Sequence, residues 1–301
     1  MPLTPLLLAG PTASGKSELA LRIAERDGGC VVNADAMQVY GCWRVLTARP
    51  QDADLVRAPH ALYGHVDCAR RYSVGDWLHD LAPVLEDLAS RAIRPIITGG
   101  TGLYFSALTE GLARIPPIPP QVRDASQALL DAGLMEVMLA DLSRDDPATF
   151  ARIDRNNPMR IQRAWCVLEA TGRGLVAWHA DGASAGLGTW NGYVVMPEKS
   201  LTNNMIENRL YKMVEQGALD ECRAFLAAGR DPGQPSARVL GAPDFIRHLR
   251  GEVDLAGAIG AAVIATRQYA KRQRSWFRNR MAGWTRLDPS AGDLLDRIPS
   301  V

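Results

Sequence analysis

A segment near the start of the chain has the spacing of a phosphate-binding loop. It matches the pattern G-x-x-x-x-G-K-[ST] and consists of Gly10, Pro11, Thr12, Ala13, Ser14, Gly15, Lys16 and Ser17. In such a loop the glycines let backbone N–H groups surround phosphate oxygens, the lysine adds positive charge, and the serine hydroxyl suits Mg²⁺. The segment therefore predicts a site for a diphosphate or triphosphate, with Mg²⁺ as cofactor and Ser17 as its ligand.

Two further segments carry groups that could act on a phosphate ester. Asp35 is followed by Ala36, Met37 and Gln38. A carboxylate beside a phosphate site can hold Mg²⁺ through water or act as a general base, although capping a helix is an equally good interpretation. Thr101, in the segment Gly99–Tyr104, has a hydroxyl that can donate to a phosphate oxygen. A plain strand-to-helix turn is the alternative for that segment.

Short apolar runs precede each of these segments. Leu6–Ala9, Cys30–Asn33 and Ile93–Thr98 are predicted strands, while the apolar spacing in Glu18–Arg26 and Asp76–Arg91 predicts helices. Strands alternating with helices indicate an α/β fold with a doubly wound parallel sheet. Ligands bind such sheets at the carboxyl ends of the strands, which is where all three segments are expected.

The pattern changes after Gly111. A proline-rich connector spans residues 115–120, the stretch 121–171 has helical spacing throughout, and a loop rich in Gly and Ala follows over 172–192. Residues 182–188 within it are expected to be flexible. Because 193–196 again resembles a strand, we predict a P-loop NTPase-like core formed by residues 1–114 and 193–301, with an inserted all-helical domain over 115–192.

The second half of the predicted core contains two long helices, Asn203–Ala228 and Leu255–Arg280. On the latter, Arg267, Lys271, Arg274 and Arg278 recur at helical spacing and would form a basic stripe beside Trp276 and Phe277. Such a stripe suits an RNA backbone, but a solvated surface helix with a buried aromatic edge explains it equally well.

Bulk properties exclude several classes of protein. The net charge is +1, so any surface for nucleic acid must be local. The five cysteines lack a C-x-x-C pair, which argues against a zinc site and predicts reduced, buried thiols in the cytoplasm. No segment resembles a secretion signal or a membrane span, and we expect no membrane partner.

The three segments, in this order, strongly resemble the motifs of bacterial tRNA dimethylallyltransferases, also called tRNA isopentenyltransferases. That family carries G-P-T-A-S-G-K-[ST], then D-S-x-Q-x-Y, then G-G-T-x-L-Y. The resemblance extends along almost the whole chain, through Thr47–Pro50, Pro59–His60, Tyr72–Val74, Asn157–Ala164, Thr266–Gln273 and Trp276–Arg278.

The resemblance implies a reaction. Such enzymes transfer a dimethylallyl group from dimethylallyl pyrophosphate to N6 of adenosine 37 in tRNAs that read codons starting with U, and pyrophosphate leaves. By resemblance, Lys16, Ser17 with Mg²⁺, and Thr101 would stabilise the departing oxygens, and Arg209 would approach them. Asp35 would orient the adenine amine and accept its proton.

The resemblance also implies an interface with the tRNA anticodon stem-loop. The base would leave its stack to reach Gln38 and its neighbours. The expected tRNA-binding residues are Asp35, Ala36, Met37, Gln38, Thr101, Arg123, Met159, Arg160, Ile161, Gln162, Arg163, Arg267, Lys271 and Arg274. We expect a cytoplasmic monomer.

Several positions depart from the family pattern, and they are Asn33, Ala36, Leu46, Arg49, Met205 and Ala242. They leave Lys16, Ser17, Asp35 and Thr101 intact. An ATP-dependent small-molecule kinase is the main alternative, but it would need an acidic residue at the end of the third strand, where Gly-Gly-Thr stands. An adenylate isopentenyltransferase and a non-catalytic RNA-binding protein are further alternatives.

Overall fold

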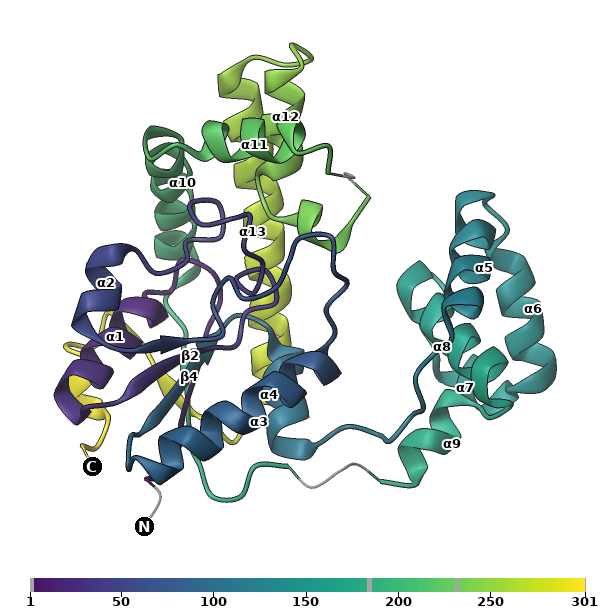
Figure 1. Ribbon diagram of the computed structural model, residues 1–301, viewed down its shortest axis with the longest axis horizontal. Coiled ribbons are helices and arrows are strands. Elements are labelled where there is room, and N and C mark those ends of the chain that lie inside the picture. Colours follow the sequence, from purple (N-terminus) through teal and green to yellow (C-terminus); the bar gives the residue numbers. More distant parts are fainter. Residues whose placement is uncertain (1–2, 183–185, 231–232, 301) are drawn as a thin grey trace. The chain divides into compact units, whose positions relative to one another are not determined.

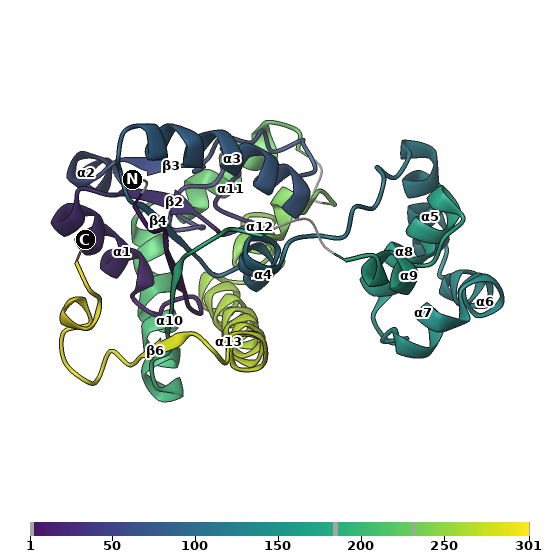
Figure 2. The same cartoon turned by 90° about the horizontal axis from the view of Figure 1, so that it is seen from below.

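The computed structural model describes residues 3–182, 186–230 and 233–300 (Figures 1 and 2). The chain divides into two compact units. The first, which we call the core unit, combines residues 1–109 with 188–301, and the second, the helical unit, comprises residues 110–187. None of the helices in the described ranges is long and apolar enough to cross a membrane.

The core unit contains one sheet in which every strand pairing is parallel. The predicted parallel α/β fold is therefore confirmed. The strand order is β3-β2-β4-β1-β5-β6. The strands are β1 (Leu6–Ala9), β2 (Cys30–Asn33), β3 (His60–Ala61), β4 (Pro95–Gly99), β5 (Asn191–Val195) and β6 (Thr285–Leu287).

The register of the central strands brings the three predicted site segments together. Ala9 is paired with Gly99, and Asn33 with Thr98. The carboxyl ends of β1, β2 and β4 therefore lie at one edge of the sheet, each followed by one of the three segments. Strands β3 and β6 were not predicted, because runs of two or three residues carry no measurable alternation.

Helices cover the sheet and extend beyond its edge (Figure 1). In chain order they are α1 (Lys16–Asp27), α2 (Asp52–Arg57), α3 (Val74–Ser90), α4 (Gly102–Glu110), α10 (Lys199–Glu215), α11 (Ala218–Ala227), α12 (Ala242–Leu249) and α13 (Leu255–Arg280), with short 3₁₀ helices at Pro235–Arg238 and Leu295–Arg297. The single helix predicted over Asn203–Ala228 is wrong. Gly217, with a φ of 98°, separates α10 from α11 in a conformation that favours glycine.

The largest apolar cluster joins helices α10, α11, α12 and α13 to the segment that follows β2. Trp43 from that segment is fully buried, stacks on Phe225 of α11 and donates a 2.8 Å hydrogen bond to the carbonyl of Ser236. Helices α10 and α13 lie side by side in this cluster (Figure 2). The packing fixes these helices relative to the carboxyl edge of the sheet.

The helical unit has its own core. It contains α5 (Pro120–Asp131), α6 (Met135–Asp145), α7 (Pro147–Arg152), α8 (Pro158–Thr171) and α9 (Leu175–Ala180). Proline opens α5, α7 and α8, where its missing N–H costs no hydrogen bond. Helix α9 was not predicted and lies in the expected loop 172–192. Of the stretch 182–188 expected to be flexible, residues 183–185 lie outside the described ranges.

Two cysteines correct the expectation of five reduced thiols. Cys42 and Cys68 form a disulfide with a Cα–Cα distance of 6.1 Å, within the range that a disulfide spans. A bridge between Tyr40 and Val66 brings their segments together, and sequence spacing cannot reveal such a long-range contact. Cys30, Cys166 and Cys222 are free and buried, as predicted.

Candidate active site

The phosphate-binding loop joins the buried end of β1 to the first turn of α1. Gly15 precedes the helix with a φ of 83°, and no side chain caps the N–H groups of the first turn. Gly10 is required because a Cβ atom there would lie 2.8 Å from both Ser14 Oγ and the carbonyl oxygen of Val195. The loop therefore presents uncapped N–H groups at a helix N-terminus, where an anion is stabilised.

Lys16 is held over this loop. Its Nζ donates a 3.2 Å hydrogen bond to the carbonyl of Pro11. Burial lowers the pKa of Lys16 to about 8, with Asp35 opposing the shift and Arg209 adding to it. The Oγ of Ser14 is buried without a hydrogen-bond partner among the described residues. A lysine short of compensating charge and an unpaired buried hydroxyl both fit an anionic ligand.

Asp35 is fixed by the residue that ends β2. Asn33 donates to the carbonyls of Asp35 and Leu62, both at 3.0 Å, and its Oδ1 accepts from the Asp35 N–H at 2.9 Å. Asp35 Oδ1 accepts from the N–H of Met37 at 3.0 Å. Residues 36–39 form turns, so the helix-capping interpretation of Asp35 is wrong. One carboxylate oxygen orients the turn, and the carboxylate lines the cavity described below.

The turn after β4 packs closely against the end of β2. A Cβ atom at Gly99 would lie 2.0 Å from the carbonyl oxygen of Ala34, which explains the glycine. Thr101 Oγ1 accepts a 2.9 Å hydrogen bond from the N–H of Ala36. Thr101 is therefore tied to the Asp35 segment.

Gln273 of α13 links two of the three segments, and sequence reasoning assigned it no role. It is only 5% exposed. Its Oε1 accepts from the N–H of Thr12 at 2.9 Å, and its Nε2 donates to the carbonyl of Gly100 at 2.8 Å. Gln273 lies in the Thr266–Gln273 segment that resembles the family motif, and this was the available indication of its importance. The spacing of residues along a helix does not reveal that one side chain bridges two loops.

These segments enclose a cavity of about 380 Å³. Nine of the predicted site residues line it, and they are Thr12, Lys16, Ser17, Asp35, Ala36, Met37, Gln38, Thr101 and Arg209. Six apolar side chains form what we call the apolar wall, and they are Leu46, Ile206, Leu210, Met213, Val239 and Leu240. The cavity can thus accept a ligand with an anionic end and an apolar end.

Three arginines line the cavity, and none of them forms an ion pair within the described ranges. Arg209 of α10 has a pKa lowered by burial, which Asp35 opposes, and it makes no ion pair or hydrogen bond within the described ranges. Arg238 and Arg272 also line the cavity, although sequence reasoning did not single them out. Arg209 is partly buried, whereas Arg238 and Arg272 are exposed. An arginine without a carboxylate partner beside a cavity is typical of a site that binds an anion.

Gln38 has less freedom than the sequence implied. Its Nε2 donates to the carbonyls of Thr47 at 2.8 Å and Ala48 at 3.0 Å, which occupies both amide hydrogens. Only its Oε1 remains to accept a hydrogen bond from a ligand. Gln38 therefore also fixes the loop 44–49, which borders the cavity.

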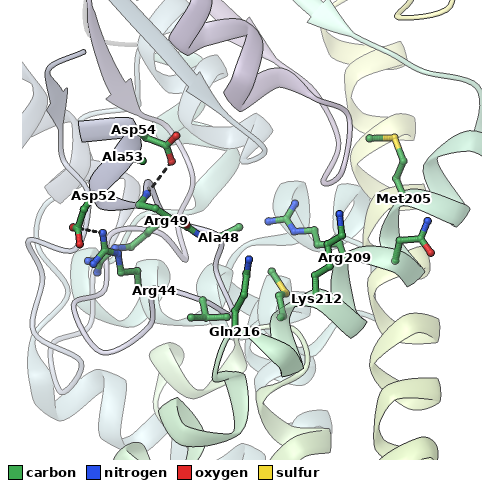
Figure 3. Close-up of a pocket in the computed structure, with 14 residues that line it drawn as sticks. Arg44, Ala48, Arg49, Asp52, Ala53, Asp54, Met205, Arg209, Lys212 and Gln216 are labelled. Atoms are coloured by element: carbon green, nitrogen blue, oxygen red, sulfur yellow. Dashed lines mark hydrogen bonds and ion pairs between the residues drawn. The ribbon is translucent and has the colours of Figure 1, made fainter. Parts of the chain in front are cut away.

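A wider groove of about 860 Å³ adjoins the cavity (Figure 3). Arg44 and Arg49 come from the loop on one side, and Arg209 and Lys212 from α10 on the other. Arg44 is paired with Asp52 at 2.6 Å. Arg209 and Met213 of α10 line both spaces, so the groove and the cavity lie next to each other at this helix.

The predicted basic stripe of α13 lines a separate hollow, outside the cavity and the groove. Arg267, Lys271, Arg274 and Arg278 line a hollow of about 180 Å³ together with Lys199 and Thr202 of α10. Arg267 is paired with Glu207 at 2.7 Å, and Arg274 donates to Thr202 Oγ1 at 3.1 Å. Phe277 is buried in the core. The stripe is therefore a real cluster, but none of its members lines the cavity.

The predicted tRNA-binding residues of the helical unit differ from one another in exposure. Met159, Arg160, Arg163 and Arg123 are exposed. Gln162 donates to Ser126 Oγ at 3.0 Å. The side chain of Ile161 is fully buried in the core of the unit, so this position contributes packing where a contact to RNA was expected.

The residues at the cavity fit a Mg²⁺ ion that also binds a diphosphate. The Ser17 hydroxyl and the Asp35 carboxylate both line it and are the hard oxygen donors that Mg²⁺ prefers. Within the described ranges, no group of three or more His, Cys, Asp or Glu side chains could hold a metal by itself. Phosphate oxygens and water would therefore have to complete the coordination.

Comparisons with known proteins agree on one family. A family model described as IPP transferase matches residues 38–280, and one described as isopentenyl transferase matches residues 4–61. A tRNA dimethylallyltransferase from Cereibacter sphaeroides is 55% identical over 283 residues, covering 93% of this chain and 87% of that protein. Another from Dinoroseobacter shibae is 53% identical, covering 95% of both chains.

Solved structures give the same result. A tRNA isopentenylpyrophosphate transferase from Bacillus halodurans has a TM-score of 0.69 and 28% identity, over 98% of this chain and 92% of that one. A eukaryotic dimethylallyltransferase, studied while acting on tRNA, has a TM-score of 0.82 over 94% of this chain and 73% of that one, and at 23% identity it supports the fold. The chain belongs to the tRNA dimethylallyltransferase family, also called the IPP transferase family.

Proposed function

We propose that this enzyme transfers a dimethylallyl group from dimethylallyl pyrophosphate to N6 of adenosine 37 in tRNAs that read codons starting with U. The observation that carries the proposal is the cavity, which combines a phosphate-binding loop, an anchored carboxylate and an apolar wall. Family membership supports the same reaction. The enzyme would act as a cytoplasmic monomer.

The pyrophosphate end of the donor fits the loop. Uncapped N–H groups at the start of α1, with Lys16 and Arg209, would bind its oxygens and stabilise the negative charge that grows as the bond to the prenyl carbon breaks. The Ser17 hydroxyl would hold Mg²⁺, which when bound would add positive charge at the departing oxygens. Pyrophosphate leaves with the electron pair of that bond.

The acceptor fits the side of the cavity formed by Asp35 and Thr101. N6 of a flipped adenine would attack the prenyl carbon, and the Asp35 carboxylate would accept the proton that N6 loses. Asn33 holds the backbone of Asp35, and the N–H of Met37 donates to its carboxylate oxygen Oδ1. The oxygen of Gln38 that makes no bond to the loop would accept from the base.

The remaining cations would bind the RNA backbone. Arg123, Arg160 and Arg163 of the helical unit and Arg267, Lys271 and Arg274 of α13 are the candidates, and we propose the helical unit as the part that grips the anticodon stem-loop. Met159 is exposed beside Arg160 and offers an apolar surface to an unstacked base.

The test is direct. An anticodon stem-loop with adenosines at positions 36, 37 and 38 is incubated with the enzyme, dimethylallyl pyrophosphate and Mg²⁺, and the RNA is analysed by mass spectrometry. We expect the mass gain of one dimethylallyl group on adenosine 37. No gain on RNA, together with hydrolysis of ATP or phosphorylation of a small molecule, would instead support a kinase.

A further inference from the structure

We propose that Glu221 of α11 is a positioning residue for the acceptor side of the site. It holds the loop 44–49 through backbone N–H groups, and this loop holds the amide of Gln38 with its oxygen free for the acceptor base. The inference rests on the proposed function, because it concerns how Gln38 meets that base. Glu221 itself lines none of the described cavities.

The carboxylate of Glu221 accepts hydrogen bonds from three consecutive N–H groups of the loop. Its Oε1 accepts from Arg44 at 2.7 Å and from Val45 at 2.8 Å, and its Oε2 accepts from Leu46 at 3.0 Å. Each of these bonds has a charged acceptor and is therefore stronger than a bond between neutral groups. A side chain of α11 thus fixes the first half of the loop, although the two lie far apart in the sequence.

The loop transmits this constraint to Gln38. Two hydrogen bonds of 2.9 Å between backbone groups of the loop close it into a turn, so its N–H groups and its carbonyls move together. Gln38 donates one amide hydrogen to the carbonyl of Thr47 at 2.8 Å and the other to that of Ala48 at 3.0 Å. Glu221 and Gln38 therefore bind the same turn, one through its N–H groups and the other through its carbonyls.

The carbonyls of the turn determine which end of the Gln38 amide is free. If the amide were flipped, its oxygen would face two carbonyl oxygens, and none of the three would have a donor. Gln38 lines the cavity together with Asp35, so the group that it offers to a ligand there is a hydrogen-bond acceptor. An acceptor suits the amine of adenine and disfavours the O6 carbonyl of hypoxanthine. Without Glu221, the turn loses its anchor and the amide its fixed orientation.

A second contact between α11 and the same segment provides a matched control. Phe225 is 2% exposed and stacks on Trp43, with the ring centroids 4.8 Å apart. This contact is apolar packing, so Phe225→Leu should destabilise the fold while the hydrogen bonds of Glu221 and Gln38 persist. A purely structural role of Glu221 would give the same result as this control.

The experiment measures the affinity of the wild type, Glu221→Gln, Glu221→Ala and Phe225→Leu for two anticodon stem-loops, one with adenosine and one with inosine at position 37. Exchange of a matched hydrogen bond for two facing acceptors should make the wild type prefer adenosine by about 10-fold. We expect this preference to be lost in both Glu221 variants and retained in Phe225→Leu. Gln38→Ala, alone and combined with Glu221→Ala, completes a double-mutant cycle.

The cycle decides whether Glu221 acts through Gln38. The assignment is supported if the Glu221 substitutions abolish the preference for adenosine, whereas Glu221→Ala changes nothing further once Gln38 is alanine. If Glu221→Ala fails to fold, Glu221→Gln must still reduce the preference.

Three results would overturn the assignment: folded Glu221 variants with the preference of the wild type, an equal loss in Phe225→Leu, or a wild type that binds both stem-loops equally. A wild type that transfers no dimethylallyl group to the adenosine stem-loop would overturn the proposed function instead.

Discussion

At the scale of single residues, Lys16 links the chemistry to pH. Burial lowers its pKa to about 8, so in the free enzyme it is charged below that pH and neutral above it. A neutral lysine binds pyrophosphate less well. We expect kcat/KM for the donor to fall by up to about 10-fold per pH unit above pH 8, whereas kcat changes less because bound phosphate raises the lysine pKa.

Initial rates across pH 6 to about 9.5, at saturating RNA, measure this profile. Lys16→Arg provides the control, since a guanidinium stays charged throughout that range. This variant should be slower but should lose the alkaline decline. A decline that persists unchanged in Lys16→Arg would assign it to another group.

Asp35 gives a second prediction at this scale. Asp35→Asn keeps an oxygen that can accept from the N–H of Met37, so the turn should persist, but it removes the base. Single-turnover transfer should fall by about 10²- to 10⁴-fold, while stem-loop binding in a filter assay stays within a few-fold. Near-normal transfer by the variant would exclude Asp35 as the proton acceptor.

At the scale of elements, α13 positions the loops of the site through Gln273. Gln273→Leu removes the acceptor for the partly buried Thr12 N–H and the donor to the buried carbonyl of Gly100. We expect a loss of about 1–3 kcal/mol in the free energy of unfolding and a higher KM for the donor. Gln268→Leu is the control, because Gln268 is exposed on the same helix. Equal effects of the two substitutions would contradict the role of Gln273.

The disulfide joins the segment after β2, which contains Cys42, to the segment that contains Cys68. Cys42 and Cys68 close a loop with a sequence separation of 26, which constrains the unfolded chain by about 3–4 kcal/mol. Alkylation of the denatured protein should label three cysteines without reductant and all five with it. Cys42→Ser with Cys68→Ser should lower the melting temperature relative to the oxidised wild type. Five labelled cysteines in the absence of reductant would show that the bond does not form.

The elements that could be predicted from the sequence are those that depend on a local motif or periodicity. The loop Gly10–Ser17, the first two strands and helix Leu255–Arg280 were all located correctly, because their motifs or periodicity extend over enough residues. Gln273 as a bridge, Arg272 in the cavity and the Cys42–Cys68 bond depend on packing between distant segments. Local spacing holds no information about such contacts, so only the folded chain reveals them.

At the scale of the whole molecule, the two units have separate cores. Met138, Leu142, Ile161, Ala164 and Val167 of the helical unit are all fully buried, and they pack within that unit. The phosphate loop, Asp35, Thr101 and Gln273 all belong to the core unit. Donor binding and chemistry should therefore depend on the core unit, and RNA affinity in large part on the helical unit.

Division of the chain tests this separation. Residues 110–187 produced alone should show helical circular dichroism and a cooperative thermal transition, since their apolar core is complete. A core unit in which a Gly/Ser linker replaces that segment should still be thermally protected by the sulfur analogue of the donor, but should bind the stem-loop at least about 10-fold more weakly. A core unit that binds RNA with undiminished affinity would show that α13 and the residues around Asp35 suffice for tRNA recognition.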